Sequence, residues 1–142
     1  MWISELENRL ESLDIEGALT EAIDQTKEQY ADLNRGQWAK GLRSDGSNIE
    51  PAPYSPGYAR KRQREGLQTA FIDLNRTGAL YGGYAINQDS GVMRLSSEVD
   101  YEQYVSRRYT PAIYGLTDEN MSIYRGVVRP IIMQNVKEQL YG

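Results

Sequence analysis

The sequence contains no cysteine and no histidine among its 142 residues. Without cysteine the chain forms no disulfide, holds no zinc through thiolates and has no cysteine nucleophile. Without histidine it lacks the commonest general base, the commonest metal ligand and a central member of the usual catalytic triads. An enzyme built from this chain would depend on carboxylates, lysine or tyrosine. We therefore expect no enzyme, and no catalytic, metal or cofactor site.

Long apolar runs are also missing. No stretch approaches the roughly 18 consecutive apolar residues that a membrane-spanning helix needs, so we expect no membrane partner. The first residues, MWISELENRLESLD, become acidic at Glu5 and lack the basic-then-apolar pattern of a signal peptide, so we expect no export. With 39% hydrophobic and 25% charged residues, the composition is that of an ordinary globular domain.

The chain does have an uneven charge and many tyrosines. Residues 1–34 hold nine acidic and two basic residues, a net charge of −7, whereas residues 35–142 have a net charge of +3. Two interpretations are open: an acidic arm that meets a basic face of another subunit, or a helix with a solvated acidic face.

The sequence contains eleven tyrosines but only one phenylalanine. Tyrosine is enriched at interfaces, although chance drift in composition also explains such an excess.

Apolar spacing predicts helices at both ends of the chain. We expect a short helix from Ile3, a break near Asp14 and a longer helix to about Ala39. Residues 121–140 carry the strongest helical pattern, with Thr117 as the candidate N-cap. Pro130 lies inside this segment and is expected to kink or divide the helix.

The middle of the chain predicts shorter elements. SDGSN at 44–48 reads as a turn, 58–65 as a basic helix, and GALYGG at 78–83 as a helical turn capped by Thr77. Residues 84–86 and 92–99 read as two strands of a hairpin around NQDSG, followed by a short helix within 101–109. The expected fold class is α+β: an N-terminal helix, a small antiparallel sheet built on a hairpin, and a long C-terminal helix kinked near Pro130. Residues 1–34 would form an acidic helical arm and residues 35–142 an α+β body, most simply as one domain.

The densest basic cluster consists of Arg60, Lys61, Arg62 and Arg64. Such a cluster suits phosphates, and a DNA-binding packaging accessory or regulatory protein is one hypothesis. The sequence pI of about 4.9 argues against a dedicated nucleic-acid binder, so a solvated or subunit-facing patch is favoured. Adjacent acids such as Asp118 and Glu119 are better explained as partners of a helix dipole than as a catalytic pair. A carboxylate-dependent cell-wall hydrolase, the third hypothesis, would need two acids facing one cleft.

The order of four segments resembles the phage virion morphogenesis family, the small tail-completion proteins of Mu-like phages, and more distantly the tail-component proteins of lambdoid phages. The segments span roughly residues 35–140. They are QWAKGLRSDGSNIEPAPYSPGYARKRQREG (with Trp38, Asp45, Gly46, Ile49, Tyr54, Ser55, Pro56, Lys61 and Gly66), DLNRTGAL (Leu74, Thr77, Gly78 and Leu80), VDYEQYV (99–105) and TPAIYGLTDEN (110–120). The last is similar to the family's entry into its final helix, ARPFLGLS, at residues 112–117. The family's His and Gly after the third segment are replaced here by Arg107, Arg108 and Tyr109, and residues 1–34 have no counterpart.

The resemblance implies a structural virion component: a neck or tail-completion ring protein at the head–tail junction, assembled in the host cytoplasm. Its partners would be further copies of itself, usually in rings of six or twelve, and neighbouring portal, adaptor or tail proteins. DNA would be touched only as a lining of the ring's lumen. It would act by assembly, without catalysis or cofactors. The expected interface residues are Ile113, Tyr114, Tyr109, Arg107, Arg108, Tyr54, Tyr58, Arg60, Lys61, Arg62 and Arg64.

The segment TPAIYGLTDEN places apolar residues on a connection that is usually polar. Gly115 to Asn120 would begin the last helix. Ile113 and Tyr114 would either fold inward or lie against a neighbouring subunit. The second interpretation is favoured, because a ring gives these side chains a place outside their own chain.

Overall fold

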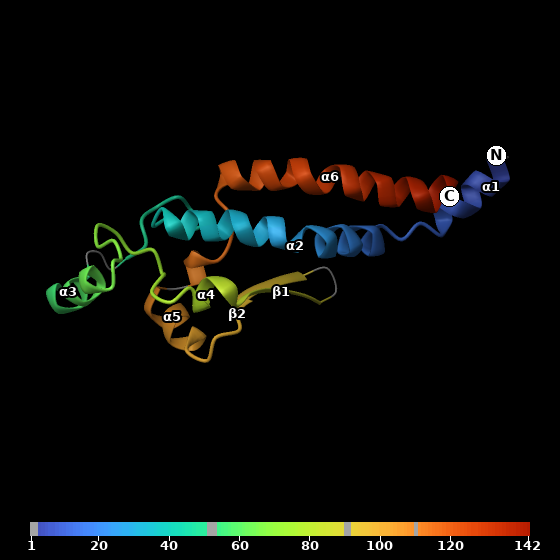
Figure 1. The fold of residues 1–142 in the computed structure, drawn as a ribbon. Coiled ribbons are helices and arrows are strands. Elements are labelled where there is room, and N and C mark those ends of the chain that lie inside the picture. Colours follow the sequence, from blue (N-terminus) through green and yellow to red (C-terminus); the bar gives the residue numbers. More distant parts are fainter. Residues whose placement is uncertain (1–2, 51–53, 90–91, 110) are drawn as a thin grey trace.

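A computed structural model of the chain describes residues 3–50, 54–89, 92–109 and 111–142. Two long helices, α2 (Ile15–Ala39) and α6 (Asp118–Tyr141), lie side by side along an elongated molecule (Figure 1). A small α+β unit lies against α2 on the side away from α6, so α2 is the middle layer. This arrangement confirms the α+β class with helices at both ends and an antiparallel hairpin between them.

The N-terminal helices follow the predicted pattern. Helix α1 spans Ile3–Glu11, and α2 begins at Ile15 after the predicted break. The Asp14 carboxylate caps α2 by accepting a 2.8 Å hydrogen bond from the Gly17 amide. The proposed division between residues 34 and 35 coincides with no structural break: α2 runs through it, and buried residues on both sides belong to the packed interior.

Two short helices lie in the centre of the chain. Helix α3 spans Pro56–Arg64, capped by the Ser55 hydroxyl, which accepts from the Tyr58 amide. Helix α4 spans Ala79–Gly82. Its N-cap is Gly78 at φ 81° and not Thr77 as predicted, because only a residue without a side chain adopts this left-handed conformation at no steric cost. Thr77 still contributes, since its hydroxyl accepts from the Ala79 amide at 3.3 Å.

The hairpin pairs β1 (Tyr84–Asp89) with β2 (Val92–Ser97) in antiparallel register, with Tyr84 opposite Ser97. Strand β1 is longer than predicted, since Asn87, Gln88 and Asp89 belong to the ladder and not to the loop. The rest of that loop, residues 90–91, lies outside the described residues. Met93 and Leu95 pack toward the interior, as the alternation predicted. Val99, assigned to the same strand, follows the end of β2.

Helix α5 (Glu102–Tyr109) and a single 3₁₀ turn, η1 (Pro111–Ile113), lead into α6. Thr117 is the N-cap of α6, as predicted, and its hydroxyl accepts a 3.2 Å hydrogen bond from the Asn120 amide. Pro130 lies inside α6, which continues unbroken to Tyr141, so the proline does not divide the helix. No helix in the described part of the chain is both long and apolar enough to cross a bilayer.

The interior consists of two apolar clusters. One joins α2 to α6 and the hairpin; its buried members are Ala22, Tyr30, Ile86, Leu116, Tyr124 and Val128. The other lies under the α+β unit; its buried members are Trp38, Ile49, Ile72, Leu80 and Ile113. Helix α2 contributes to both, which is why it holds the α+β unit and α6 in a fixed relation.

Candidate interaction surfaces

The segment 113–117 is clasped by side chains of α2. Asn34 is fully buried; its amide nitrogen donates to the Ile113 carbonyl at 3.1 Å, and its oxygen accepts from the Gly115 amide at 2.9 Å and from the Tyr84 hydroxyl. The Trp38 indole nitrogen also donates to the Ile113 carbonyl, at 2.7 Å. An irregular segment inside a protein needs partners for its backbone polar groups, and these side chains supply them.

One turn further along, Gln37 continues the clasp. Its nitrogen donates to the Gly115 carbonyl at 2.9 Å, and its oxygen accepts from the Thr117 amide at 3.0 Å. Burial raises the pKa of Tyr84 and of Tyr114 above the ordinary range for tyrosine, so both remain neutral donors. The clasp therefore holds the start of α6 to the end of α2.

The expectation that Ile113 contacts a neighbouring subunit is wrong. Ile113 has 0% of its surface exposed and packs within its own chain against Trp38. Tyr114 is half-buried, and its hydroxyl donates to the Glu102 carboxylate at 3.1 Å. The sequence does contain a signal for this arrangement, in the spacing of Asn34, Gln37 and Trp38. This spacing places two amide groups and an indole on one face of a helix.

The expected location of Arg62 is also wrong. It was expected in an exposed basic patch, yet it is 1% exposed. Its guanidinium donates to the Gln68 and Asn75 carbonyls, both at 3.0 Å, and pairs with the Asp73 carboxylate at 3.1 Å. It also lies 4.4 Å from the centroid of the Tyr54 ring. Arg62 thus fastens α3 to the loop 65–78 and is unavailable to a partner.

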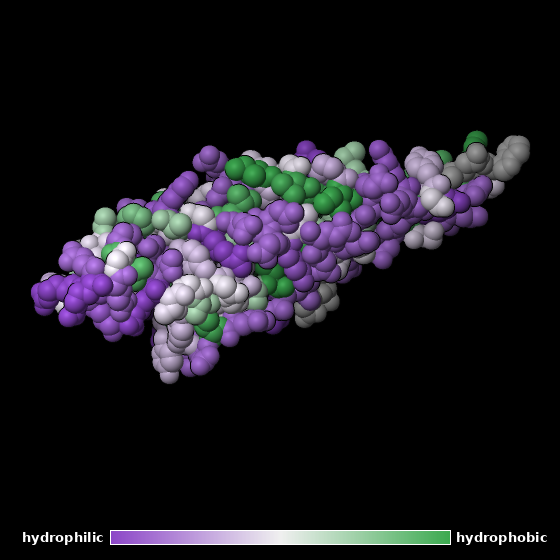
Figure 2. All heavy atoms as spheres, viewed as in Figure 1, coloured by the Kyte–Doolittle hydropathy of each residue, from purple (hydrophilic) through white to green (hydrophobic). Residues whose placement is uncertain are grey.

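The other cations expected at an interface are on the surface. Arg60, Lys61 and Arg64 of α3 are exposed, and so are Arg107 and Arg108 of α5. Figure 2 shows a mostly hydrophilic surface at the α3 end of the molecule, with a few apolar atoms among the polar ones. No ion pair within the described residues involves any of the three α3 cations. They form a positive tip on the molecule.

Between α3, α4 and α5 lies a cavity of about 360 Å³, here called the tyrosine pocket. Its depth is apolar, formed by Ile72, Leu74, Leu80 and Val105. The rest is lined by four tyrosines, Tyr54, Tyr58, Tyr101 and Tyr109, and by the polar residues Arg62, Asn75, Arg76 and Thr77. Three of the predicted interface tyrosines therefore meet at one site, and Tyr101 is the residue that sequence reasoning missed there.

The polar groups behind the pocket are mostly paired. The Tyr54 hydroxyl accepts from the Asp73 amide at 3.2 Å, and burial raises the pKa of Tyr54 to about 12. Arg76, on the rim, forms a 3.2 Å ion pair with Glu65. The lining combines apolar side chains with phenols and with two arginines that are each paired with a carboxylate, so the pocket suits an apolar guest that has a polar border. It offers no activated nucleophile or base.

A second cleft, of about 560 Å³, opens between the end of α2 and the start of α6. It contains Asp32, Asp45, Asp118 and Glu119, all exposed. The Ser47 hydroxyl and amide hydrogen-bond to Asp45 and lower its pKa, the opposite of what a general acid needs. Within the described ranges no three acidic side chains are placed to hold a metal ion. The cleft therefore gives the hydrolase hypothesis no support.

Comparison with protein-family models, curated proteins and solved structures finds no match to this chain.

Proposed function

We propose that this protein is a structural subunit of a bacteriophage virion, a neck or tail-completion ring protein at the head–tail junction that acts by assembly without catalysis. The sequence resemblance supplies the hypothesis. The observation that carries it furthest is that the elongated molecule has two chemically unlike ends: acidic α1 and the start of α2 at one, and the cationic α3 with the tyrosine pocket at the other (Figure 1).

Unlike ends favour head-to-tail contacts between copies. A heterologous contact of this kind generates a closed ring when the rotation between neighbours closes. Helix α6 also leaves apolar side chains uncovered, with Ile123 and Met133 exposed, and Figure 2 shows hydrophobic surface along this helix. Such a surface supports contact with a further protein, for which portal, adaptor or tail proteins are the proposed partners.

The proposal is tested on particles and on the isolated protein. Mass spectrometry of purified virions should find this chain in a fixed ratio to the portal protein, and electron microscopy of the purified chain should show rings. Removing the gene should leave heads and tails that do not join. Virions that lack the chain, or normal particles formed without it, reject the proposal.

DNA binding by α3 is the second candidate. It is favoured by the three exposed cations Arg60, Lys61 and Arg64 on one short helix. The test is a gel shift in low salt with the triple variant Arg60→Gln/Lys61→Gln/Arg64→Gln. Binding that weakens with salt and with these changes supports the candidate. Unaltered DNA mobility with the wild-type chain eliminates it.

A further inference from the structure

We propose that helix α1 of one copy docks into the tyrosine pocket of the next copy, so that the occupant of the pocket is the N-terminal arm of an identical chain. The inference rests on the proposed ring assembly and names the two surfaces that join its subunits. It is carried by a partly uncovered apolar helix face, an open pocket of matching character, and opposite charges on the two.

Helix α1 leaves two apolar side chains, Ile3 and Leu10, largely exposed. Ile3, Leu6, Leu10 and Leu13 recur at helical spacing, yet Ile3 is 77% exposed and Leu10 is 50% exposed. None of the residues Ile3–Glu11, all of which the structure describes, is buried. A helix of nine residues is only marginally stable alone in water. Packing of its apolar face against a partner would stabilise it.

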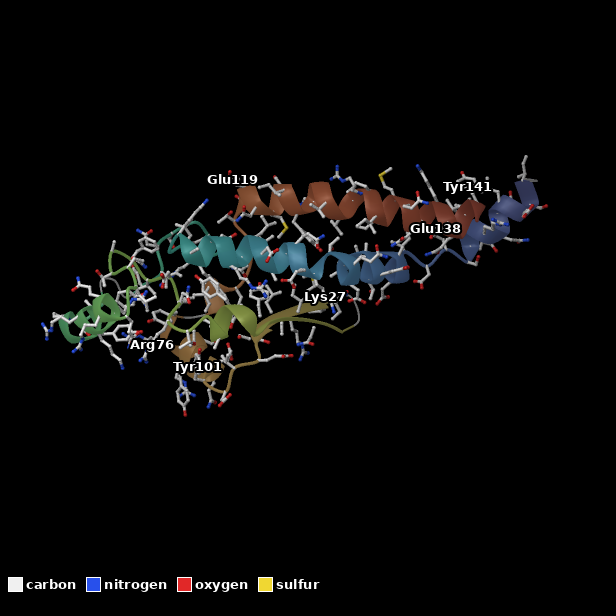
Figure 3. The ribbon with its side chains drawn as sticks, viewed as in Figure 1. Lys27, Arg76, Tyr101, Glu119, Glu138 and Tyr141 are labelled. Atoms are coloured by element: carbon white, nitrogen blue, oxygen red, sulfur yellow. The ribbon has the colours of Figure 1, made fainter. Side chains whose placement is uncertain are left out.

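Hydrogen bonds hold the C-terminal side of α1 and the residue that precedes α2 to the end of α6. Arg9 donates to the Leu140 carbonyl at 2.9 Å, and Gln139 bonds both the amide and the carbonyl of Asp14, at 2.6 and 2.8 Å. These bonds fix the base of the arm on the end of α6. Figure 3 shows Glu138 and Tyr141 at this end and Arg76 and Tyr101 at the other. Helix α1 therefore lies at the N-terminal end of the molecule with its base fixed on the end of α6.

The tyrosine pocket has the complementary shape and chemistry. Its volume of about 360 Å³ lies in the range of about 300–1,000 Å³ that preformed binding sites occupy. Branched aliphatic side chains fit its apolar depth, beside Leu74 and Val105. The rim presents phenols, including Tyr101 at 44% exposure, which suit a half-buried protein contact. An amphipathic helix laid in a groove is a recurrent mode of recognition.

The charges of the two surfaces are opposite. Helix α3, beside the pocket, carries four cations and no acid. Helix α1 carries Glu5, Glu7 and Glu11 against Arg9, and Arg9 pairs with Glu5 at 3.1 Å. Glu7 and Glu11 are thus the carboxylates offered to the exposed Lys61 and Arg64. Because α1 and the pocket lie at opposite ends of the molecule (Figure 1), the arm cannot reach its own pocket, and the occupant must belong to another copy.

The test uses three full-length variants whose changed residues are exposed. The arm variant is Ile3→Asp/Leu10→Asp, the pocket variant is Tyr101→Asp, and the matched control is Ile15→Asp, at an exposed isoleucine outside both surfaces. Circular dichroism establishes that each is folded. Native mass spectrometry and analytical ultracentrifugation then measure assembly. The arm and pocket variants should each assemble roughly tenfold or more weakly than the wild type, and the control should match it.

Mixing gives the decisive result. The pocket variant has an intact arm and the arm variant has an intact pocket, so an equimolar mixture should form one-to-one dimers although each variant alone is monomeric. Arm and pocket variants that assemble like the wild type, or a mixture that stays monomeric, overturn the docking. In the first case the ring persists through other contacts, and the proposed function stands. Wild-type chain that is monomeric at every concentration also overturns the docking, while the composition of virions separately decides the function.

Discussion

At the scale of single residues, Asn34 is the position on which most local order depends. One amide satisfies the Ile113 carbonyl, the Gly115 amide and the Tyr84 hydroxyl, and all of this occurs at a fully buried site. Trp38 and Gln37 reinforce the same segment from the next turn of α2. Buried polar groups contribute modestly when paired but cost much when left unpaired. Asn34 therefore fixes the conformation of the segment before α6, although it belongs to no binding or catalytic site.

Replacement of Asn34 by alanine should lower the free energy of unfolding by about 2–3 kcal/mol. The change leaves the Gly115 amide and the Tyr84 hydroxyl without the acceptor they share. Urea denaturation measures it. The matched control is Gln25→Ala on the exposed face of the same helix, which should change stability by less than about 0.5 kcal/mol. An equal loss in both variants would contradict the role given to Asn34.

The buried tyrosines predict alkaline instability. Burial raises the pKa of Tyr54 from 10.0 to about 12, and also raises that of Tyr30, Tyr81, Tyr84 and Tyr114. Below pH 10 both the folded and the unfolded chain hold these protons, so the stabilisation is fully present. Above pH 10 the unfolded chain releases protons that the folded chain keeps, so stability falls as pH rises through the folded pKa values.

The measurement is the free energy of unfolding between pH 9 and pH 12, with tyrosinate absorbance recorded in parallel. Stability should fall continuously over this interval. The variant Tyr54→Phe removes one of the titrating groups, so the slope of stability against pH should be shallower than in the wild type. Its absolute stability also changes through loss of the bond from the Asp73 amide, which is why the slope is the readout. A flat profile in the wild type would refute the prediction.

At the scale of elements, the sequence predicts what is locally encoded. The sequence predicts the break at Asp14 and the start of α6 at Thr117, because a cap bonds amides only two or three residues away. It does not predict the placement of Ile113, because the partner Asn34 lies 79 residues earlier in the chain. Arg62 was misassigned for the same reason: a run of cations predicts a solvated face, and only the fold brings Asp73 and two carbonyls to one of them.

Helix α6 gives an element-scale prediction, since it carries both Pro130 and Gly126 on its exposed face. Pro130→Ala restores a backbone donor for the Gly126 carbonyl and should raise the free energy of unfolding by about 1–3 kcal/mol. Gly126→Ala is the comparison: its added methyl group meets nothing within 4 Å, and it should add about 0.5–1 kcal/mol. Thermal and urea denaturation measure both. A loss of stability in Pro130→Ala would mean that the packing of α6 on α2 requires the proline.

At the scale of the whole molecule, the arrangement of charge has a consequence that no single contact has. Acidic α1 and the start of α2 lie at the opposite end of the molecule from the cations of α3, so copies aligned head to tail attract while copies aligned end to like end repel. This distribution of charge favours head-to-tail association over association of like ends. Helix α2 contributes buried side chains to both apolar clusters, whereas none of the residues that the structure describes in α1 is buried, and α1 is the part that we propose contacts a neighbour.

Head-to-tail association should weaken as salt rises, because the Debye length shrinks from about 10 Å at 0.1 M to about 3 Å at 1 M. Reversing the arm with Glu7→Lys/Glu11→Lys, or the tip with Lys61→Glu/Arg64→Glu, should each reduce assembly at low salt, and combining all four changes should restore it. Sedimentation velocity across a salt series measures both effects. Assembly that strengthens with salt, or a combined variant no better than its parents, would show that apolar contacts alone join the copies and that the charges at the two ends do not pair.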